Sequence, residues 1–105
     1  MDGIDAAILG TDGERIESFG PVRFQRYSDE MRARLREALQ AAASIRAAGP
    51  LPSEIERLER DLTDAHADAA RNLLAEANLK PEQIGIIGFH GQTLVHRPAE
   101  RMTLQ

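Results

Sequence analysis

One short segment, Ile84–Phe89, places the strongest constraint on the fold of this chain. Its residues, IGIIGF, are apolar or glycine throughout, show no helical period and are too few for a typical helix. Such runs are typical of a strand that is buried on both faces, and such strands occur mostly in parallel sheets that helices cover. The segment therefore predicts a buried strand in a helix-covered sheet.

Two helices are predicted before this strand. Apolar residues recur at helical spacing from Met31 to Ile45, and Ser28 supplies N-cap chemistry, so we expect a first helix from about Asp29 to Ala47. Gly49 and Pro50 interrupt the pattern. The next stretch predicts a separate helix.

The second helix is predicted by a longer apolar stripe. The stripe runs from Ile55 to Ala77 with spacings of three and four, and Ser53 with Glu56 forms a capping box at its start. Asn78 and Pro81 are typical of its end. We expect this helix to cover the sheet.

Hairpins are predicted near both ends of the chain. Ile4–Leu9 and an arm from about Arg15 to Phe24 flank an Asp-Gly turn, and Gly20–Pro21 predicts a bulge or an edge position because proline has no N–H for the ladder. Leu94–Val95 and Met102–Leu104 suggest a second, short hairpin. The order β-β-α-α-β-β indicates an α/β or α+β chain.

Composition excludes several classes of function. The formal net charge of -4 gives no electrostatic reason to expect nucleic acid or an anionic membrane as a partner. The absence of cysteine excludes disulfides and thiolate metal sites. No apolar run is long enough for a transmembrane helix and no signal peptide is present, so the cytoplasm is the expected compartment.

A polar cluster follows the predicted strand. Ligands of open α/β sheets collect beyond the carboxyl ends of strands, and His90, Gly91, Gln92 and Thr93 lie at that place. Gly91 would allow close approach or a positive φ, while the other three offer donors and acceptors that suit a sugar. The structural alternative is a strand-ending turn with a hydrogen-bonded histidine.

A second candidate site lies at the first residues. Asp2 and Asp5 place two carboxylates around Gly3 at the mouth of a strand. Backbone N–H groups there can approach phosphate oxygens, and the carboxylates can hold Mg²⁺ directly or through water. Asp-Gly is also a common turn, so a purely structural role is the alternative.

The remaining histidines are poorer candidates. His66 lies on the apolar stripe, which favours a core or helix-sheet histidine, and Asp64 and Asp68 point to other faces of the helix. His90 and His96 can meet across a hairpin, but a catalytic metal usually needs a third protein ligand.

Three segments together resemble one family. The stretches "MDGIDAAIL", "LTDAHADAARNLL" and "IGIIGFHGQTLVHRP" are similar to the N-terminal part of anhydro-N-acetylmuramic acid kinases, sugar kinases with the actin/hexokinase type of ribonuclease-H-like fold. The resemblance implies transfer of the γ-phosphoryl group of ATP, with Mg²⁺, to 1,6-anhydro-N-acetylmuramic acid. It also implies that water opens the anhydro ring, giving N-acetylmuramic acid 6-phosphate in peptidoglycan recycling.

The resemblance assigns roles to particular residues. The family's nucleotide loop, Gly-Thr-Ser-Met/Leu-Asp-Gly-x-Asp, is matched in its second half by Met1, Asp2, Gly3, Ile4 and Asp5. It implies that Asp2 and Asp5 lie near the phosphates and the magnesium, and that Gly3 forms a tight turn. His90, Gly91, Gln92 and Thr93 match a segment beside the cleft, which implies a supporting or sugar-contacting role.

Other parts of the family pattern are expected outside residues 1–105. The resemblance places the first strand and the Gly-Thr-Ser half of the loop before Met1, and the water-activating aspartate after Gln105. We therefore expect a partial N-terminal domain of a sugar kinase that is a homodimer at full length, with no catalytic residue of its own. We also expect that the isolated chain neither forms the family's sheet nor catalyses, because the first strand would join the hairpin to Ile84–Phe89.

Two alternatives stay open at this point. A small α/β interaction module would use the stripe from Ile55 to Ala77 to bind a partner helix. A catalytically inactive relic is the other form of this alternative. A metal-dependent hydrolase on the same framework would use Asp2 and Asp5 as ligands, although it lacks the further acidic residues that such a site needs.

Overall fold

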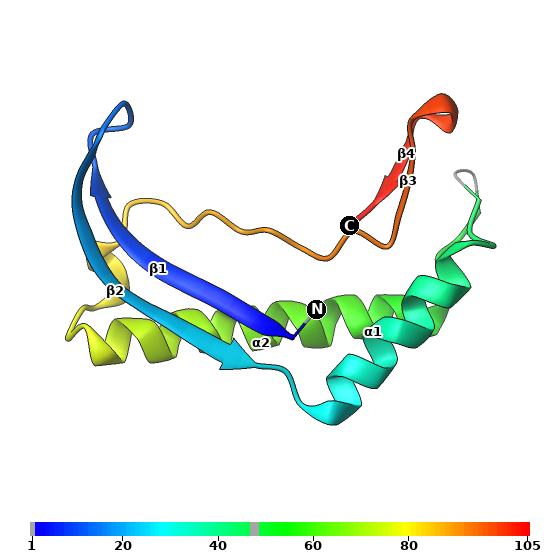
Figure 1. Cartoon of the computed structure of the whole chain (residues 1–105), viewed down its shortest axis with the longest axis horizontal. Helices are drawn as coiled ribbons and strands as arrows, with labels where there is room; N and C mark the ends of the chain where they lie inside the picture. The colour runs from blue at the N-terminus through cyan, green and yellow to red at the C-terminus, as the bar shows by residue number, and fades with distance from the viewer. Residues whose placement is uncertain (1, 47–48) are drawn as a thin grey trace. The chain divides into compact units, whose positions relative to one another are not determined.

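The computed structural model describes residues 2–46 and 49–105, and it contains both helices and strands (Figure 1). The described chain divides into two compact units. The hairpin unit contains Asp2–Arg26 and Thr63–Ile87, and the helix unit contains Tyr27–Leu62 and Gly88–Gln105. Helix α2 (Ser53–Glu76) contributes its first residues to the helix unit and the rest to the hairpin unit.

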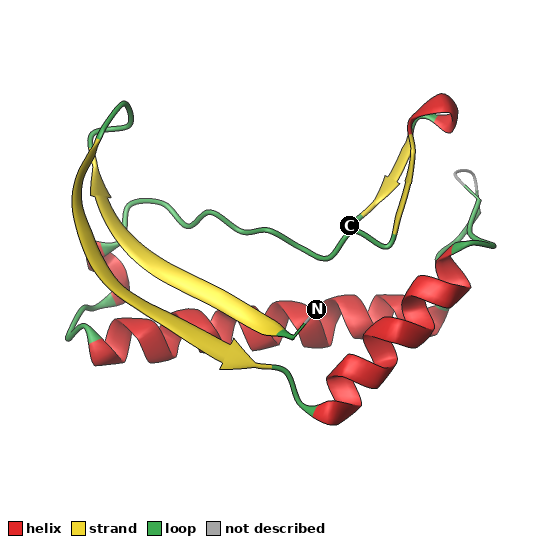
Figure 2. Ribbon diagram, viewed as in Figure 1, coloured by secondary structure: helices red, strands yellow, loops and turns green. Residues whose placement is uncertain are grey.

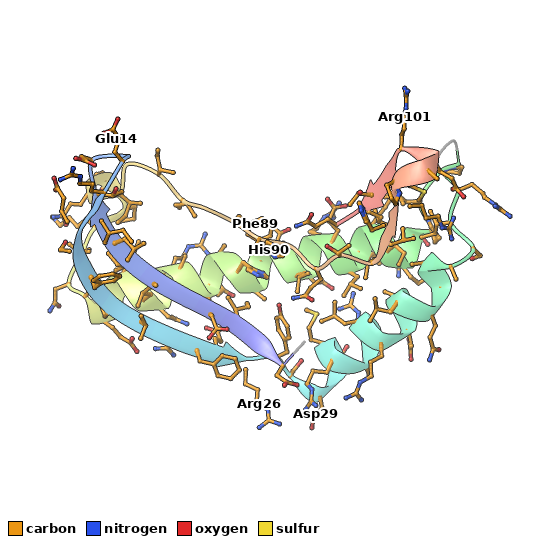
Figure 3. All side chains as sticks on the ribbon, turned by 45° about the horizontal axis from the view of Figure 1, so that its top comes forward. Glu14, Arg26, Asp29, Phe89, His90 and Arg101 are labelled. Atoms are coloured by element: carbon orange, nitrogen blue, oxygen red, sulfur yellow. The ribbon has the colours of Figure 1, made fainter. Side chains whose placement is uncertain are left out.

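The hairpin unit begins with two long antiparallel strands, β1 (Gly3–Thr11) and β2 (Ile16–Arg26), drawn in yellow in Figure 2. Gly13 in the connecting turn has φ +97°, a conformation that favours glycine. The Asp12 carboxylate accepts hydrogen bonds from the backbone N–H groups of Glu14 (2.9 Å) and Arg15 (2.8 Å). Glu14 projects at the tip of this turn (Figure 3). The predicted Asp-Gly hairpin is confirmed.

The predicted irregularity in the second strand is also confirmed. Ala7 pairs with Val22 but Leu9 pairs with Phe19, so the register shifts between these two pairs. Gly20–Pro21 occupies the extra position of β2. A bulged residue is not required to donate a hydrogen bond to the ladder, and proline has no N–H to donate.

One face of the hairpin contacts the second part of α2. Arg23 forms an ion pair with Glu76, and Nδ2 of the Asn72 side chain donates a hydrogen bond to Oε1 of Gln25 at 3.2 Å. Ala69 and Leu73 are buried on this part of the helix. Arg23 and Gln25 therefore lie on the face of the hairpin that bonds to α2.

The second helix ends as the sequence predicted. Asn78 has φ +54°, the N–H of Leu79 donates to the carbonyl of Leu74 at 2.9 Å, and the N–H of Asn78 donates to Ala75 at 3.2 Å. These two bonds form a Schellman motif, which satisfies the last carbonyls of the helix.

The helix unit packs α1 (Asp29–Ala42) with the first part of α2. Ser28 caps α1 by accepting from the Met31 N–H at 3.1 Å, which confirms the predicted start. The apolar residues buried in this unit are Tyr27, Leu35, Ala38, Ala42, Ile45, Ile55, Leu58 and Leu62. An ion pair between Arg34 and Asp61, 2.7 Å long, joins the two helices at their surface.

The first helix is shorter than predicted. It ends at Ala42 instead of Ala47, and residue 47 lies outside the described residues. The Ser44 hydroxyl donates to the carbonyl of Ala41 at 2.9 Å, and the Ile45 N–H bonds to Ala42 in a tighter turn. A serine that bonds to a backbone carbonyl competes with helical hydrogen bonds, which explains the early end.

A short hairpin completes the helix unit and confirms the second predicted hairpin. Strands β3 (Val95–Arg97) and β4 (Met102–Leu104) are antiparallel. The Arg97 guanidinium donates to the carbonyls of Ile45 (3.0 Å) and Ala43 (2.6 Å), just beyond the end of α1. One arginine thus links this hairpin to the first helix.

The predicted buried strand at Ile84–Phe89 is wrong. Only Ile84 is half-buried, and the exposed fractions of Ile86, Ile87 and Phe89 are 90%, 72% and 58%. Within the described residues, β1 and β2 pair with each other and β3 and β4 pair with each other, so both sheets are antiparallel and no strand is left to pair with this segment. A strand without a neighbour has no ladder for its backbone groups.

Candidate functional site

The first predicted site lies at the beginning of β1 in the hairpin unit. Asp2 and Asp5 are exposed, whereas Ile4 is buried with 5% of its surface exposed. Gly3 is the first strand residue and pairs with Arg26, so the tight turn expected at this glycine is not formed. The pairing partner in β2 holds it extended instead. Met1 lies outside the described residues.

Gly3 lacks room for any side chain. A Cβ built on its backbone would lie 2.7 Å from Cε2 and Cζ of the Phe24 ring and would collide with the carbonyl oxygen of Gln25. The Phe24 ring therefore lies directly against the backbone of Gly3. A bulkier residue would have to displace both the ring and a strand carbonyl.

The two carboxylates suit only part of a metal site. No group of three or more acidic or histidine side chains that could hold a metal is found in the described part of the chain. Mg²⁺ usually takes one or two protein carboxylates and fills its other positions with phosphate oxygens and water. Asp2 and Asp5, both exposed, fit that donor set but not an all-protein cage.

The second predicted site lies in the helix unit, in the segment before β3. His90 and Thr93 are exposed, Gln92 is half-buried and Gly91 is buried. A Cβ on Gly91 would lie 3.3 Å from Cγ of Gln105, so the glycine allows close approach. Gly13 is the only glycine with positive φ among the described residues, so Gly91 does not need that conformation.

Tyr27 contributes to this second region. Burial raises the pKa of the Tyr27 phenol above its usual value, and an interaction with the Gln92 side chain offsets part of this rise. The phenol thus lies near the Gln92 amide, although its oxygen has no hydrogen-bond partner among the described residues. His90 extends from the same segment next to Phe89 (Figure 3).

The other histidines behave as structural residues. His96 Nδ1 lies 2.8 Å from the Thr103 hydroxyl oxygen, and these two residues pair across β3 and β4. His66 is half-buried on α2, as expected for a histidine on the apolar stripe. The predicted site residues fall into separate groups, with Asp2–Asp5 in the hairpin unit and His90–Thr93 in the helix unit.

Comparison with known proteins identifies the family. A family model described as anhydro-N-acetylmuramic acid kinase matches residues 1–105. The chain belongs to the anhydro-N-acetylmuramic acid kinase family. Curated kinases of that name are 44% identical in Nitrobacter winogradskyi, 42% in Rhodopseudomonas palustris and 47% in Brucella suis, each over 105 residues and the whole of this chain.

The chain spans 29%, 29% and 28% of the length of these three anhydro-N-acetylmuramic acid kinases. No solved structure matches it. Among the described residues, no helix combines the length and the apolar character needed to cross a membrane.

Sequence reasoning missed two residues in this chain. Phe24 was assigned only to a strand, yet its ring lies against Gly3 because the hairpin register places it opposite Asp5. The sequence pattern does not single out Tyr27. Its position between β2 and the N-cap Ser28 was the available signal, since a lone aromatic residue between two elements is well placed to be buried.

Proposed function

We propose that residues 1–105 form part of the N-terminal domain of a kinase that phosphorylates 1,6-anhydro-N-acetylmuramic acid with ATP. The observation that carries this proposal is the family match over the whole chain, within which the DGID and HGQT motifs both lie. The proposed framework is the ribonuclease-H-like fold of actin and hexokinase. The proposed setting is peptidoglycan recycling in the cytoplasm, by a homodimer.

Besides one proton transfer, the proposed reaction forms two bonds and breaks two bonds. The γ-phosphorus of ATP separates from the β–γ bridging oxygen and bonds to O6 of the sugar. The C1–O6 bond of the anhydro bridge breaks while a water oxygen bonds to C1 and loses its proton to a base. The products are ADP and N-acetylmuramic acid 6-phosphate. We assign the base to an aspartate outside these residues, so the 105-residue chain alone is expected to be inactive.

Asp2 and Asp5 are the proposed ligands of Mg²⁺. When bound, the ion would neutralise charge on the phosphate oxygens, which is a large part of catalysis in phosphoryl transfer. Exposure of both carboxylates supports this role. Met1 and Ile4 complete the proposed nucleotide-binding segment, in which buried Ile4 anchors the strand.

His90, Gly91, Gln92 and Thr93 are the proposed sugar-contacting residues. The exposed imidazole and hydroxyl groups offer hydrogen-bond donors and acceptors to a polyhydroxylated ligand. The side chain of Gln105 packs closely against the backbone at Gly91.

The interaction module is not favoured. It required the apolar stripe of α2 to be available to a partner helix. Instead Ile55, Leu58, Leu62, Ala69 and Leu73 are buried within the chain.

The proposal is tested with a chimeric kinase. Residues 1–105 replace the matching region of the Nitrobacter winogradskyi relative, and ADP release is measured with and without the anhydro sugar. We expect sugar-dependent turnover and a product heavier than the substrate by one phosphoryl group and one water. Asp2→Asn and Asp5→Asn should each lower kcat at least tenfold and raise the Mg²⁺ requirement, whereas exposed Asp64→Asn on α2 is the matched control. A folded chimera without sugar-dependent turnover would refute the proposal.

A further inference from the structure

Tyr27, between β2 and α1, carries a hydroxyl group that packing of the helix unit does not explain. The residue is 6% exposed, and its phenol oxygen is buried without a hydrogen-bond partner among the described residues. Burying a hydroxyl without a partner destabilises the folded state, and a phenylalanine of nearly the same shape would avoid this cost. Because buried polar groups are almost always bonded, this hydroxyl is a candidate for a hydrogen bond that is completed when a ligand binds.

The Gln92 side chain lies near this phenol. Burial raises the pKa of the Tyr27 phenol, and the Gln92 side chain lowers it. A neighbouring amide lowers the pKa of a phenol by stabilising the phenolate, and only its N–H groups can donate to that anion. The Gln92 side chain therefore presents Nε2 to the phenol oxygen. Because Nε2 and Oε1 branch in different directions from the same carbon, Oε1 is directed away from Tyr27.

Gln92 connects the interior of the helix unit with its surface. Tyr27 and the segment His90–Thr93 both belong to this unit. Gln92 is half-buried, whereas His90 and Thr93 beside it are exposed. With Nε2 toward the buried phenol, Oε1 is the acceptor that remains for a ligand on the exposed side. A hydroxyl group is a donor that such an oxygen binds, and a sugar carries several hydroxyl groups.

We propose that Tyr27 is a positioning residue for the sugar. When the sugar binds, the Nε2 amide group of Gln92 donates a full hydrogen bond to the Tyr27 hydroxyl oxygen, and this bond fixes Oε1 of Gln92 to accept from a sugar hydroxyl. Tyr27 itself does not contact the sugar. The partner that the phenol lacks in the free chain is thus supplied in the complex. This inference rests on the proposed function, because it requires the sugar-contacting role of His90–Thr93.

Steady-state kinetics of the chimera with the Nitrobacter winogradskyi kinase test the proposal. Tyr27→Phe should raise the KM for the anhydro sugar by about fivefold, the loss expected for one hydrogen bond, and leave kcat and the KM for ATP unchanged. In a Gln92→Ala background the same substitution should have no further effect on the KM for the sugar. Gln40→Ala, exposed on α1, is the matched control. An unchanged KM in Tyr27→Phe, or an equal rise in both backgrounds, would overturn the proposal.

Titration of the 105-residue chain tests the contact without any turnover. Tyr27 is the only tyrosine and the chain has no tryptophan, so the ultraviolet absorbance change at high pH reports the ionisation of this phenol alone. Gln92→Leu removes the N–H groups and should raise the pKa of the Tyr27 phenol further, whereas Gln40→Leu should leave it unchanged. The same pKa in Gln92→Leu and in the parent chain would overturn the proposal.

Thermal unfolding of the same chain separates a positioning role from a structural one. Because the Tyr27 hydroxyl has no partner among the described residues, Tyr27→Phe should keep or raise the Tm at neutral pH. A lower Tm would mean that the hydroxyl already stabilises the free chain, and the proposal would be wrong.

The outcomes also separate this inference from the proposed function. A folded chimera without sugar-dependent turnover would refute the proposed function and, with it, the sugar as the ligand of Gln92. A chimera with sugar-dependent turnover, in which Tyr27→Phe leaves the KM for the sugar unchanged, would refute the positioning role alone.

Discussion

Gly3→Ala tests whether the start of β1 has room for a side chain. The added Cβ would lie 2.7 Å from two ring atoms of Phe24 and would collide with the carbonyl oxygen of Gln25. The Phe24 ring is more than half exposed and is able to rotate away. The carbonyl belongs to β2 beside the Gly3–Arg26 pair, so moving it disturbs the ladder. The backbone collision is therefore the costly one.

The expected loss of stability follows from two opposing terms. Overpacking of this kind typically costs about 1–3 kcal/mol. Replacing glycine by alanine also restricts the unfolded chain, which returns roughly 0.4–1 kcal/mol. The middle values of these two ranges, about 2 and about 0.7 kcal/mol, leave a net loss of about 1.3 kcal/mol. At about 4–8 °C per kcal/mol for a small domain, the Tm should fall by about 5–10 °C.

Thermal unfolding followed by circular dichroism measures this change. Gly85→Ala is the control, because no atom lies within 4 Å of a Cβ at that position, and its Tm should stay the same or rise. Adding Phe24→Ala to Gly3→Ala should not restore the Tm, since the Gln25 carbonyl remains in place. A Gly3→Ala variant as stable as the parent chain would show that the strand adjusts without cost, and the argument from close approach would be refuted.

Three further predictions concern the helix unit. Arg97→Ala removes both bonds to the carbonyls beyond α1 and should cost about 1–3 kcal/mol in urea unfolding, whereas exposed Arg101→Ala should change little. If Arg97→Ala and Arg101→Ala lowered the free energy of unfolding equally, the two hydrogen bonds of Arg97 would not be the source of the loss. Ser28→Ala removes the N-cap of α1 and should cost about 1 kcal/mol, and Ser28→Asn should retain most of the stability. Burial raises the pKa of Tyr27 above 10.0, so the folded state binds this proton more tightly than the unfolded state, and stability should decline as the pH rises above about 10. In Tyr27→Phe, the free energy of unfolding measured by urea titration between about pH 9 and 11 should fall less steeply with pH. If the variant and the parent chain show the same slope, the decline comes from other groups.

The proposed site was only partly accessible to sequence reasoning. The motifs identified Asp2–Asp5 and His90–Thr93 as candidates, and their roles remain predictions. Pattern alone did not reveal that Phe24 lies against Gly3, since that contact depends on the register of two strands. The place of Gln92 beside buried Tyr27 likewise depends on how the chain returns after α2.

The sequence by itself determined the elements whose signals are local. Ser28 starts α1, Asn78 ends α2 and Gly13 closes the long hairpin. Each conformation depends on the side chain at that residue, or on its absence at Gly13, and on the few backbone groups beside it. Only the tertiary structure decided the state of Ile84–Phe89. Its composition favours a strand, but a strand requires a neighbour for its backbone hydrogen bonds, and the described chain provides none. The caps and the turn need only neighbouring residues, whereas a strand needs pairing with a distant segment, and the local sequence pattern does not encode that pairing.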